Sequence, residues 1–147
     1  MYYLIYVSYA VEPFSQDMLK ELLEKCVYKN EKQGITGMLL YIEGKFIQVL
    51  EGEKNVIKKI FDNILKDERH RKIKIIIEGM ISKRNFPNWS MGFKSINNQE
   101  LKKMTGYTDI EEYFRNKNYG EEGHIALVFL KLFYQKNYPT GGTANLP

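Results

Sequence analysis

The chain has 147 residues, of which 44% are hydrophobic and 27% are charged, a composition typical of a globular protein with a substantial core. No run approaches the roughly 20 consecutive apolar residues of a membrane span, and the single cysteine, Cys26, excludes a disulfide within the chain. The net charge of +4 is too small and too scattered to indicate a nucleic-acid-binding protein. Because one cysteine fits a reducing compartment, we expect a cytoplasmic protein without a membrane partner.

The chain opens with YYLIYVSY over residues 2–9, a run rich in β-forming residues that predicts a first strand. The opening MYYLIYVSYA lacks a basic leader, so we interpret it as this strand and not as a signal peptide. Alternation along the strand defines two faces, with Tyr2, Leu4, Tyr6 and Ser8 on one and Tyr3, Ile5, Val7 and Tyr9 on the other.

A first amphipathic helix is predicted over about residues 16–32. Ser15 is a suitable N-cap, and Gly34 is a suitable residue to end the helix. Apolar residues recur at helical spacing from Met18 to Val27. Cys26 belongs to this apolar stripe, so we assign it to the core and not to catalysis.

A β-hairpin is predicted over residues 36–42 and 45–51, with the dipeptide Glu43-Gly44 as its turn. Both faces of this hairpin are largely apolar, so we expect it to be covered on both sides. Gln48 then lies between Phe46 and Leu50 on a face that should be buried. A buried amide requires hydrogen-bond partners, so a polar group must meet Gln48.

The helical spacing returns over roughly residues 54–67 and predicts a second amphipathic helix. IKIIIEGMI, residues 73–81, predicts another long strand, and the polar stretch 84–88 with Pro87 predicts a loop. WSMGF, residues 89–93, predicts a short final strand. The resulting order, β-α-β-β-α-β-β, is an α+β pattern of the ferredoxin-like type.

The C-terminal part is less regular and predicts helices. Short helices are expected over 101–104 and 110–114, and a helix that is apolar on most sides over 123–136. The last residues, YPTGGTANLP, have the composition of a loop. We therefore expect one domain over 1–96, with a helical cap or output extension over 97–137 and a flexible tail over 138–147.

The sequence contains none of the common motifs for metal-dependent or nucleophilic catalysis or for phosphate binding. His70, His124 and Cys26 show no metal-ligand spacing, so no metal site is expected. No serine lies in a nucleophile elbow, and no glycine-rich phosphate loop occurs. An RNA-binding sheet was considered, but GKFIQVLEG lacks the required aromatic pattern and ends near Glu51.

A set of polar residues on otherwise apolar elements remains. Taken singly, each is best interpreted as a satisfied core residue or a solvated helix-end residue. Taken together, with amides facing an interhelical groove, they favour a bound polar heterocycle, because an amide matches a ring that carries both donors and acceptors. The set comprises Tyr6, Asn30, Gln48, Arg69, His70, Trp89 and Met91.

The same residues carry a family resemblance. YVS near the start, KN before GITGMLLY, GKFIQVLEG, DERH and FPNWSMGF resemble, in order and spacing, the BLUF domain, a blue-light receptor that uses FAD. The resemblance spans residues 2–95 and is closest to the short stand-alone BLUF proteins. It implies a ferredoxin-like sheet with the flavin between two helices, and a photoreceptor that is not an enzyme.

The resemblance also implies roles for the cofactor-binding residues. Tyr6 would donate an electron and a proton to the excited flavin, and Gln48 would relay the proton and change its hydrogen bonds. Asn30 would bind the amide edge of the ring, Arg69 would contact a ring carbonyl, and His70 would lie close to the ring.

Other matched positions would surround this set. Lys29 would lie near the cofactor, and Ser8 would lie near the indole of Trp89. Trp89 and Met91 would pass the signal to the last strand and the C-terminal helices, and which of them lies near the flavin stays open.

Two other functions remain possible from the residues. A flavin-dependent enzyme would have only His70 as an evident base, and an RNA-binding or regulatory ferredoxin-like module would lack flavin. For the photoreceptor, the resemblance implies self-association and a downstream protein partner of the response-regulator kind. The apolar segment 125–133 is a candidate contact.

Overall fold

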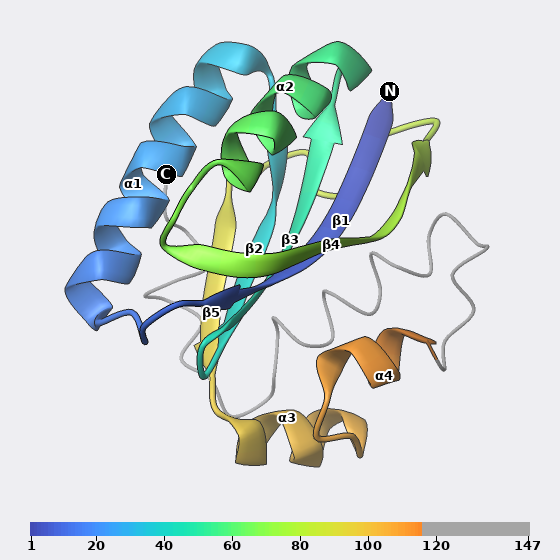
Figure 1. The fold of residues 1–147 in the computed structure, drawn as a ribbon. Coiled ribbons are helices and arrows are strands. Elements are labelled where there is room, and N and C mark those ends of the chain that lie inside the picture. Colours follow the sequence, from blue (N-terminus) through green and yellow to red (C-terminus); the bar gives the residue numbers. More distant parts are fainter. Residues whose placement is uncertain (116–147) are drawn as a thin grey trace.

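The computed structural model describes residues 1–115, which form one mixed sheet with helices on both of its faces (Figure 1). The sheet has five strands in the order β4-β1-β3-β2-β5. All neighbours are antiparallel except β2 and β5, which are parallel. The strands are β1 (Tyr2–Ala10), β2 (Thr36–Ile42), β3 (Lys45–Gly52), β4 (His70–Met80) and β5 (Gly92–Ile96).

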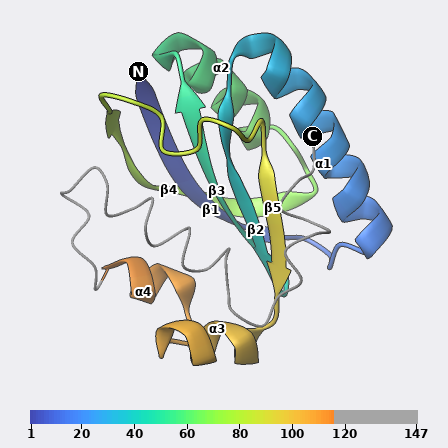
Figure 2. The same cartoon turned by 180° about the vertical axis from the view of Figure 1, so that it is seen from behind.

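The helices form two layers. In Figure 1, α1 (Gln16–Gln33) and α2 (Lys54–Leu65) lie side by side over one face of the sheet. Figure 2 shows α3 (Asn98–Thr105) and α4 (Ile110–Arg115) at the lower end of the sheet, where side chains from both pack into the core of the opposite face. No helix within the described part is long and apolar enough to cross a membrane. The predicted element order and α+β class are confirmed.

The predicted cap residues at both ends of α1 are present in the structure. The Ser15 hydroxyl accepts a hydrogen bond from the Met18 N–H at 3.2 Å, and this contact caps the first turn. Gly34 takes a left-handed conformation with φ of 69°, and its N–H donates to the Asn30 carbonyl. Leu19 and Leu23 are buried against the sheet.

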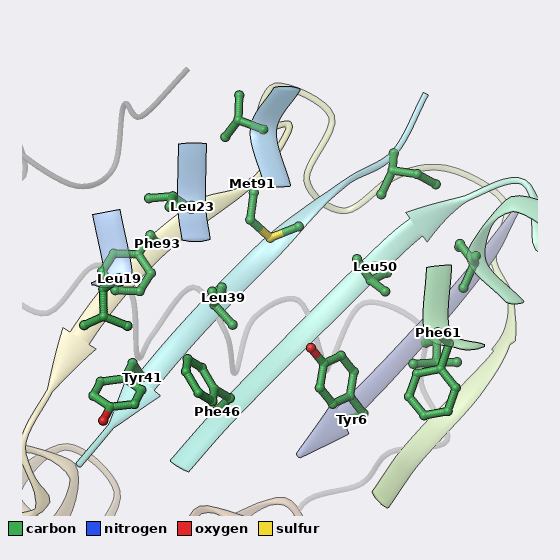
Figure 3. Packing of buried hydrophobic residues seen from close by; sticks show 14 of the residues in the cluster. Tyr6, Leu19, Leu23, Leu39, Tyr41, Phe46, Leu50, Phe61, Met91 and Phe93 are labelled. Atoms are coloured by element: carbon green, nitrogen blue, oxygen red, sulfur yellow. The ribbon is translucent and has the colours of Figure 1, made fainter. Parts of the chain in front are cut away.

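The central hairpin also follows its sequence signals. Glu43 and Gly44 both have positive φ, 41° and 89°, as a tight two-residue hairpin turn requires. Both faces of the hairpin are buried. Figure 3 shows the face toward α1 and α2, where Phe46 and Leu50 belong to one core cluster. Ile47 and Val49 belong to the core on the opposite face.

Several predicted boundaries were wrong. Strand β4 begins at His70 and not at residue 73, because its first residue already pairs with Ala10 of β1. The last strand begins at Gly92, where pairing with Met38 starts, so Trp89 and Met91 lie in the loop before β5 and not in the strand. The predicted helix over 123–136 and the tail over 138–147 lie outside the described residues.

Gly37 of β2 provides a test of this sheet. A Cβ at this position would lie 1.9 Å from the Val49 carbonyl oxygen of β3, a backbone atom that cannot move aside. Gly37→Ala should therefore lower the free energy of unfolding by about 3 kcal/mol in a denaturant titration. Gly79→Ala on β4 is the control, because its Cβ would meet only Tyr3 at 3.6 Å. Equal stability of the two variants would contradict this packing.

Candidate functional site

A cavity of about 270 Å³ lies between α1, α2 and the sheet face that they cover. Its walls combine apolar residues, such as Phe14, Leu39 and Phe46, with about as many polar and charged residues. Polar groups set in an apolar cavity are typical of small-molecule sites. All of the residues predicted to contact a cofactor line it, namely Tyr6, Lys29, Asn30, Gln48, Arg69 and His70. Residues from separate elements are thus brought to one site.

The pairing of β1 with β3 brings Tyr6 directly opposite Gln48. The Tyr6 hydroxyl donates to the Gln48 side-chain oxygen at 2.5 Å, and both side chains are 5% exposed. The Tyr6 ring lies beside Phe61 of α2, with centroids 5.6 Å apart (Figure 3). Burial raises the pKa of Tyr6 above its ordinary value, so the phenol keeps its proton at neutral pH.

Within the described part of the chain, the amide nitrogen of Gln48 has one acceptor, and it is a weak one. It donates to the sulfur of Met91 at 3.4 Å, and Met91 is fully buried. A thioether accepts hydrogen bonds poorly, so this buried donor could form a stronger bond to a ligand carbonyl. The side-chain N–H of Gln48 is therefore available to donate a hydrogen bond to a ligand in the cavity.

Asn30 complements this donor with an acceptor. Its nitrogen donates to the Ser90 carbonyl at 2.8 Å, and the side chain is only 5% exposed. Within residues 1–115 its side-chain oxygen has no hydrogen-bond partner. The cavity thus offers one buried donor and one buried acceptor to a planar ring with both kinds of group. These residues fit the isoalloxazine ring of a flavin.

Charged groups gather where the cavity opens. Arg69 contacts Asp67 through two nitrogens, at 2.6 Å and 3.0 Å, and lies 5.8 Å from the ring centre of Phe14. This guanidinium lowers the pKa of Asp67 to about 2. Lys29 is exposed at the same opening. Exposed cations at the mouth of an apolar cavity suit a ligand with anionic groups.

His70 is held in one orientation by two partners. Its Nε2 lies 2.8 Å from the Ile64 carbonyl and its Nδ1 lies 2.8 Å from the Ser8 hydroxyl. Because a carbonyl can only accept, Nε2 carries the proton, and in the neutral ring Nδ1 accepts from Ser8. Ser8 is therefore tied to His70, whereas the resemblance associates it with the indole of Trp89.

Trp89 and Met91 lie on opposite sides of the sheet. Met91 lies on the cavity side of the sheet, against Gln48. Trp89 packs against the core of the opposite face and stacks on Phe86, with ring centroids 6.0 Å apart and planes 22° apart. Asp67, the ion-pair partner of Arg69, was not predicted from the sequence, although the spacing of the two residues in DER is the signal for this pair.

Comparison with known proteins gives a consistent result. A family model described as sensors of blue light using FAD matches residues 1–92. The beta subunit of a photoactivated adenylate cyclase from Euglena gracilis is 32% identical over 89 residues, which is 60% of this chain and 10% of that protein. The alpha subunit is 35% identical over 81 residues, 55% of this chain and 8% of the relative. The chain thus spans about a tenth of these relatives.

Solved structures agree over more of the chain. The dark-state structure of BlrB, described as a BLUF protein, has a TM-score of 0.66 at 27% identity and covers 87% of this chain and 93% of its own. BlsA in its photo-activated state has a TM-score of 0.66 at 29% identity, with 87% and 89% covered. A bacterial light-regulated adenylyl cyclase has a TM-score of 0.62 at 36% identity, with 67% and 28% covered.

The ion pair at the opening of the cavity predicts a pH dependence. Because Arg69 lowers the pKa of Asp67 from 3.8 to about 2, the stability from the pair is present above the ordinary pKa and is lost as the pH falls through this range. Asp67→Asn should cost less than about 1 kcal/mol near neutral pH, since both side chains are partly exposed. The difference from the unsubstituted protein, measured by urea titration, should shrink toward pH 3.

Asp62→Asn, an exposed change on α2, is the matched control for this experiment. A stability difference for Asp67→Asn that stays constant between about pH 7 and pH 3 would contradict the assignment.

Proposed function

The chain belongs to the BLUF family of sensors of blue light using FAD, and on this premise we propose that Tyr6 and Gln48 convert the absorption of light into a change of hydrogen bonding. The family assignment confirms the resemblance found in the sequence, the ferredoxin-like α+β fold and FAD as the cofactor. It also makes this chain a sensor and not an enzyme.

One observation carries the proposal: the hydrogen bond of 2.5 Å from Tyr6 to Gln48 at the wall of the cavity. When bound, FAD supplies a ring that absorbs blue light and, once excited, takes up an electron. Tyr6 is a suitable donor because its phenol is protonated and its proton already points at the side-chain oxygen of Gln48. An electron and a proton can therefore leave Tyr6 together.

Gln48 is the residue that changes state in this proposal. Its amide has a donor end and an acceptor end, so rotation or tautomerisation exchanges what it offers to Tyr6 and to the cavity. Either change alters the contact between its nitrogen and the sulfur of Met91. A net hydrogen-bond difference of about 1 kcal/mol is enough to shift a two-state equilibrium about fivefold.

Four further residues would hold FAD in the cavity. The side-chain oxygen of Asn30 and the nitrogen of Gln48 would bind the polar edge of the ring. Arg69 would contact a ring carbonyl, and Lys29 would lie near the cofactor. His70 would lie close to the ring, oriented by its hydrogen bonds to Ser8 and Ile64.

The signal would leave through the loop before β5. Met91 contacts Gln48, and the neighbouring Ser90 carbonyl is bound by Asn30, so a change at Gln48 acts first on this loop. From there β5 leads directly to α3 and the rest of the 97–137 extension. We propose a homo-oligomer in the cytoplasm that controls a downstream protein, of the response-regulator kind.

The decisive first measurement is the absorbance spectrum of the FAD-loaded protein in darkness and after a blue flash. We expect a flavin spectrum that shifts slightly to the red without bleaching and returns in the dark. A flavin spectrum that stays unchanged after the flash would overturn the photoreceptor proposal. Size-exclusion chromatography in darkness and under blue light tests the proposed self-association.

Substitutions at the two photoactive residues test the mechanism. Gln48→Leu and Tyr6→Phe should each retain FAD but lose the reversible red shift, because one removes the switching amide and the other removes the hydroxyl proton. Tyr2→Phe is the matched control, since Tyr2 lies on the same face of β1 but bonds to Glu78 and does not line the cavity. A normal light response in Gln48→Leu would refute the role of this amide.

A further inference from the structure

Glu51 is a buried carboxylate that the proposed light reaction does not use. It lies on β3, three positions after Gln48, and its alternation along the strand directs it to the opposite face of the sheet. Its side chain is fully buried, with 0% exposure. A buried carboxylate is costly unless its oxygens are hydrogen-bonded, so its partners indicate what it does.

Its main partners are two consecutive backbone N–H groups in the loop before β5, and the Thr36 hydroxyl donates a longer hydrogen bond to it at 3.5 Å. Asn85 N–H donates to one carboxylate oxygen at 2.8 Å, and Phe86 N–H donates to the other at 2.8 Å. Burial raises the pKa of Glu51, and these two hydrogen bonds oppose that effect by favouring the charged form. The carboxylate thus accepts hydrogen bonds from the loop backbone at two adjacent residues, Asn85 and Phe86.

Arg84 also fixes the start of this loop, through hydrogen bonds to residues near the ends of β2 and β3. Its guanidinium donates to the Gly34 carbonyl at 2.6 Å, to the Glu51 backbone carbonyl at 3.0 Å and to the Thr36 hydroxyl at 2.9 Å. These contacts join the end of β3, the start of β2 and the turn after α1. The loop therefore begins at a fixed point.

Further contacts fix the rest of the loop, from Phe86 to Met91, next to Gln48. Phe86 is buried in the core and stacks on Trp89, whose carbonyl accepts from Gly37 N–H at 3.0 Å. The Ser90 carbonyl is bound by Asn30, and Met91 meets Gln48. A short and tightly held segment thus connects Glu51 on one face of β3 to Met91, which lies on the face of Gln48.

We propose that Glu51 is a positioning residue for the light response. Its carboxylate holds the segment from Asn85 to Met91 in the register that puts Met91, and not Trp89, against Gln48. It thereby sets how quickly the protein returns to its dark state, because this return requires Met91 to settle again beside Gln48. This inference rests on the proposed photoreceptor function and adds a determinant of its timing.

Glu51→Gln is the sharpest test, because it keeps the shape and removes one acceptor. The new amide NH₂ would face either Asn85 N–H or Phe86 N–H, so one hydrogen bond becomes a contact between two donors. We expect unchanged FAD binding and an unchanged red shift, since Tyr6 and Gln48 are intact. Dark recovery should slow by roughly tenfold, the change expected from the loss of one charge-assisted hydrogen bond.

Trp89 supplies a second readout that a general loss of stability would not reproduce. It is the only tryptophan of the chain, so the fluorescence of the dark, FAD-loaded protein reports directly on this loop. Its emission should shift to longer wavelength in Glu51→Gln as the indole becomes more exposed. Glu53→Gln, an exposed change two residues away, is the matched control and should behave like the unsubstituted protein.

The outcomes separate this inference from the function on which it rests. If the unsubstituted protein shows no reversible red shift, the proposed function fails. If it does, and Glu51→Gln recovers at the same rate with the same tryptophan emission, only the role of Glu51 is overturned. Should Glu51→Gln fail to fold, Arg84→Lys decides, because it loosens the same end of the loop: slowed recovery supports the role, and unchanged recovery refutes it.

Discussion

The register between β1 and β3 is the constraint on which the site depends. It sets Tyr6 directly opposite Gln48, so that a phenol and an amide share one short hydrogen bond in a buried place. A slip of one residue would send every side chain of a strand to the other face of the sheet. The pairing of β1 with β3 runs in one register from Tyr2 opposite Gly52 to Tyr9 opposite Lys45, so a slip would carry Gln48 away from Tyr6. The same contacts that build the core therefore position Tyr6 against Gln48.

Strand β3 places a buried polar side chain on each face of the sheet. Gln48 points to the cavity beneath α1 and α2, and Glu51 points to the core on the other side. One loop, from Arg84 to Met91, touches both of these polar residues. This segment thus joins the cavity to a hydrogen-bonded anchor on the opposite face of the sheet.

Much of this arrangement could be predicted from the sequence, because it rests on local signals. The hairpin followed from Glu43-Gly44, α1 from its cap at Ser15, and the special position of Gln48 from an amide between apolar neighbours. The start of β5 and the positions of Trp89 and Met91 could not be predicted in this way. They depend on contacts such as the one between Glu51 and Phe86, which are 35 residues apart in the chain. The hydrogen bond between Ser8 and His70 joins residues 62 positions apart, so no local sequence pattern predicts it.

The parallel pairing of β5 has a consequence for how the fold opens. β5 is an edge strand of five residues, held in the sheet by β2 alone, whereas β1 and β3 each lie between two antiparallel neighbours. Parallel pairing is slightly weaker per residue, and edge elements open at lower free energy than central ones. The four antiparallel strands can therefore remain folded around the cavity while β5 exchanges its amide hydrogens. This weakly paired edge of the sheet follows Met91, which contacts Gln48, and leads directly to α3.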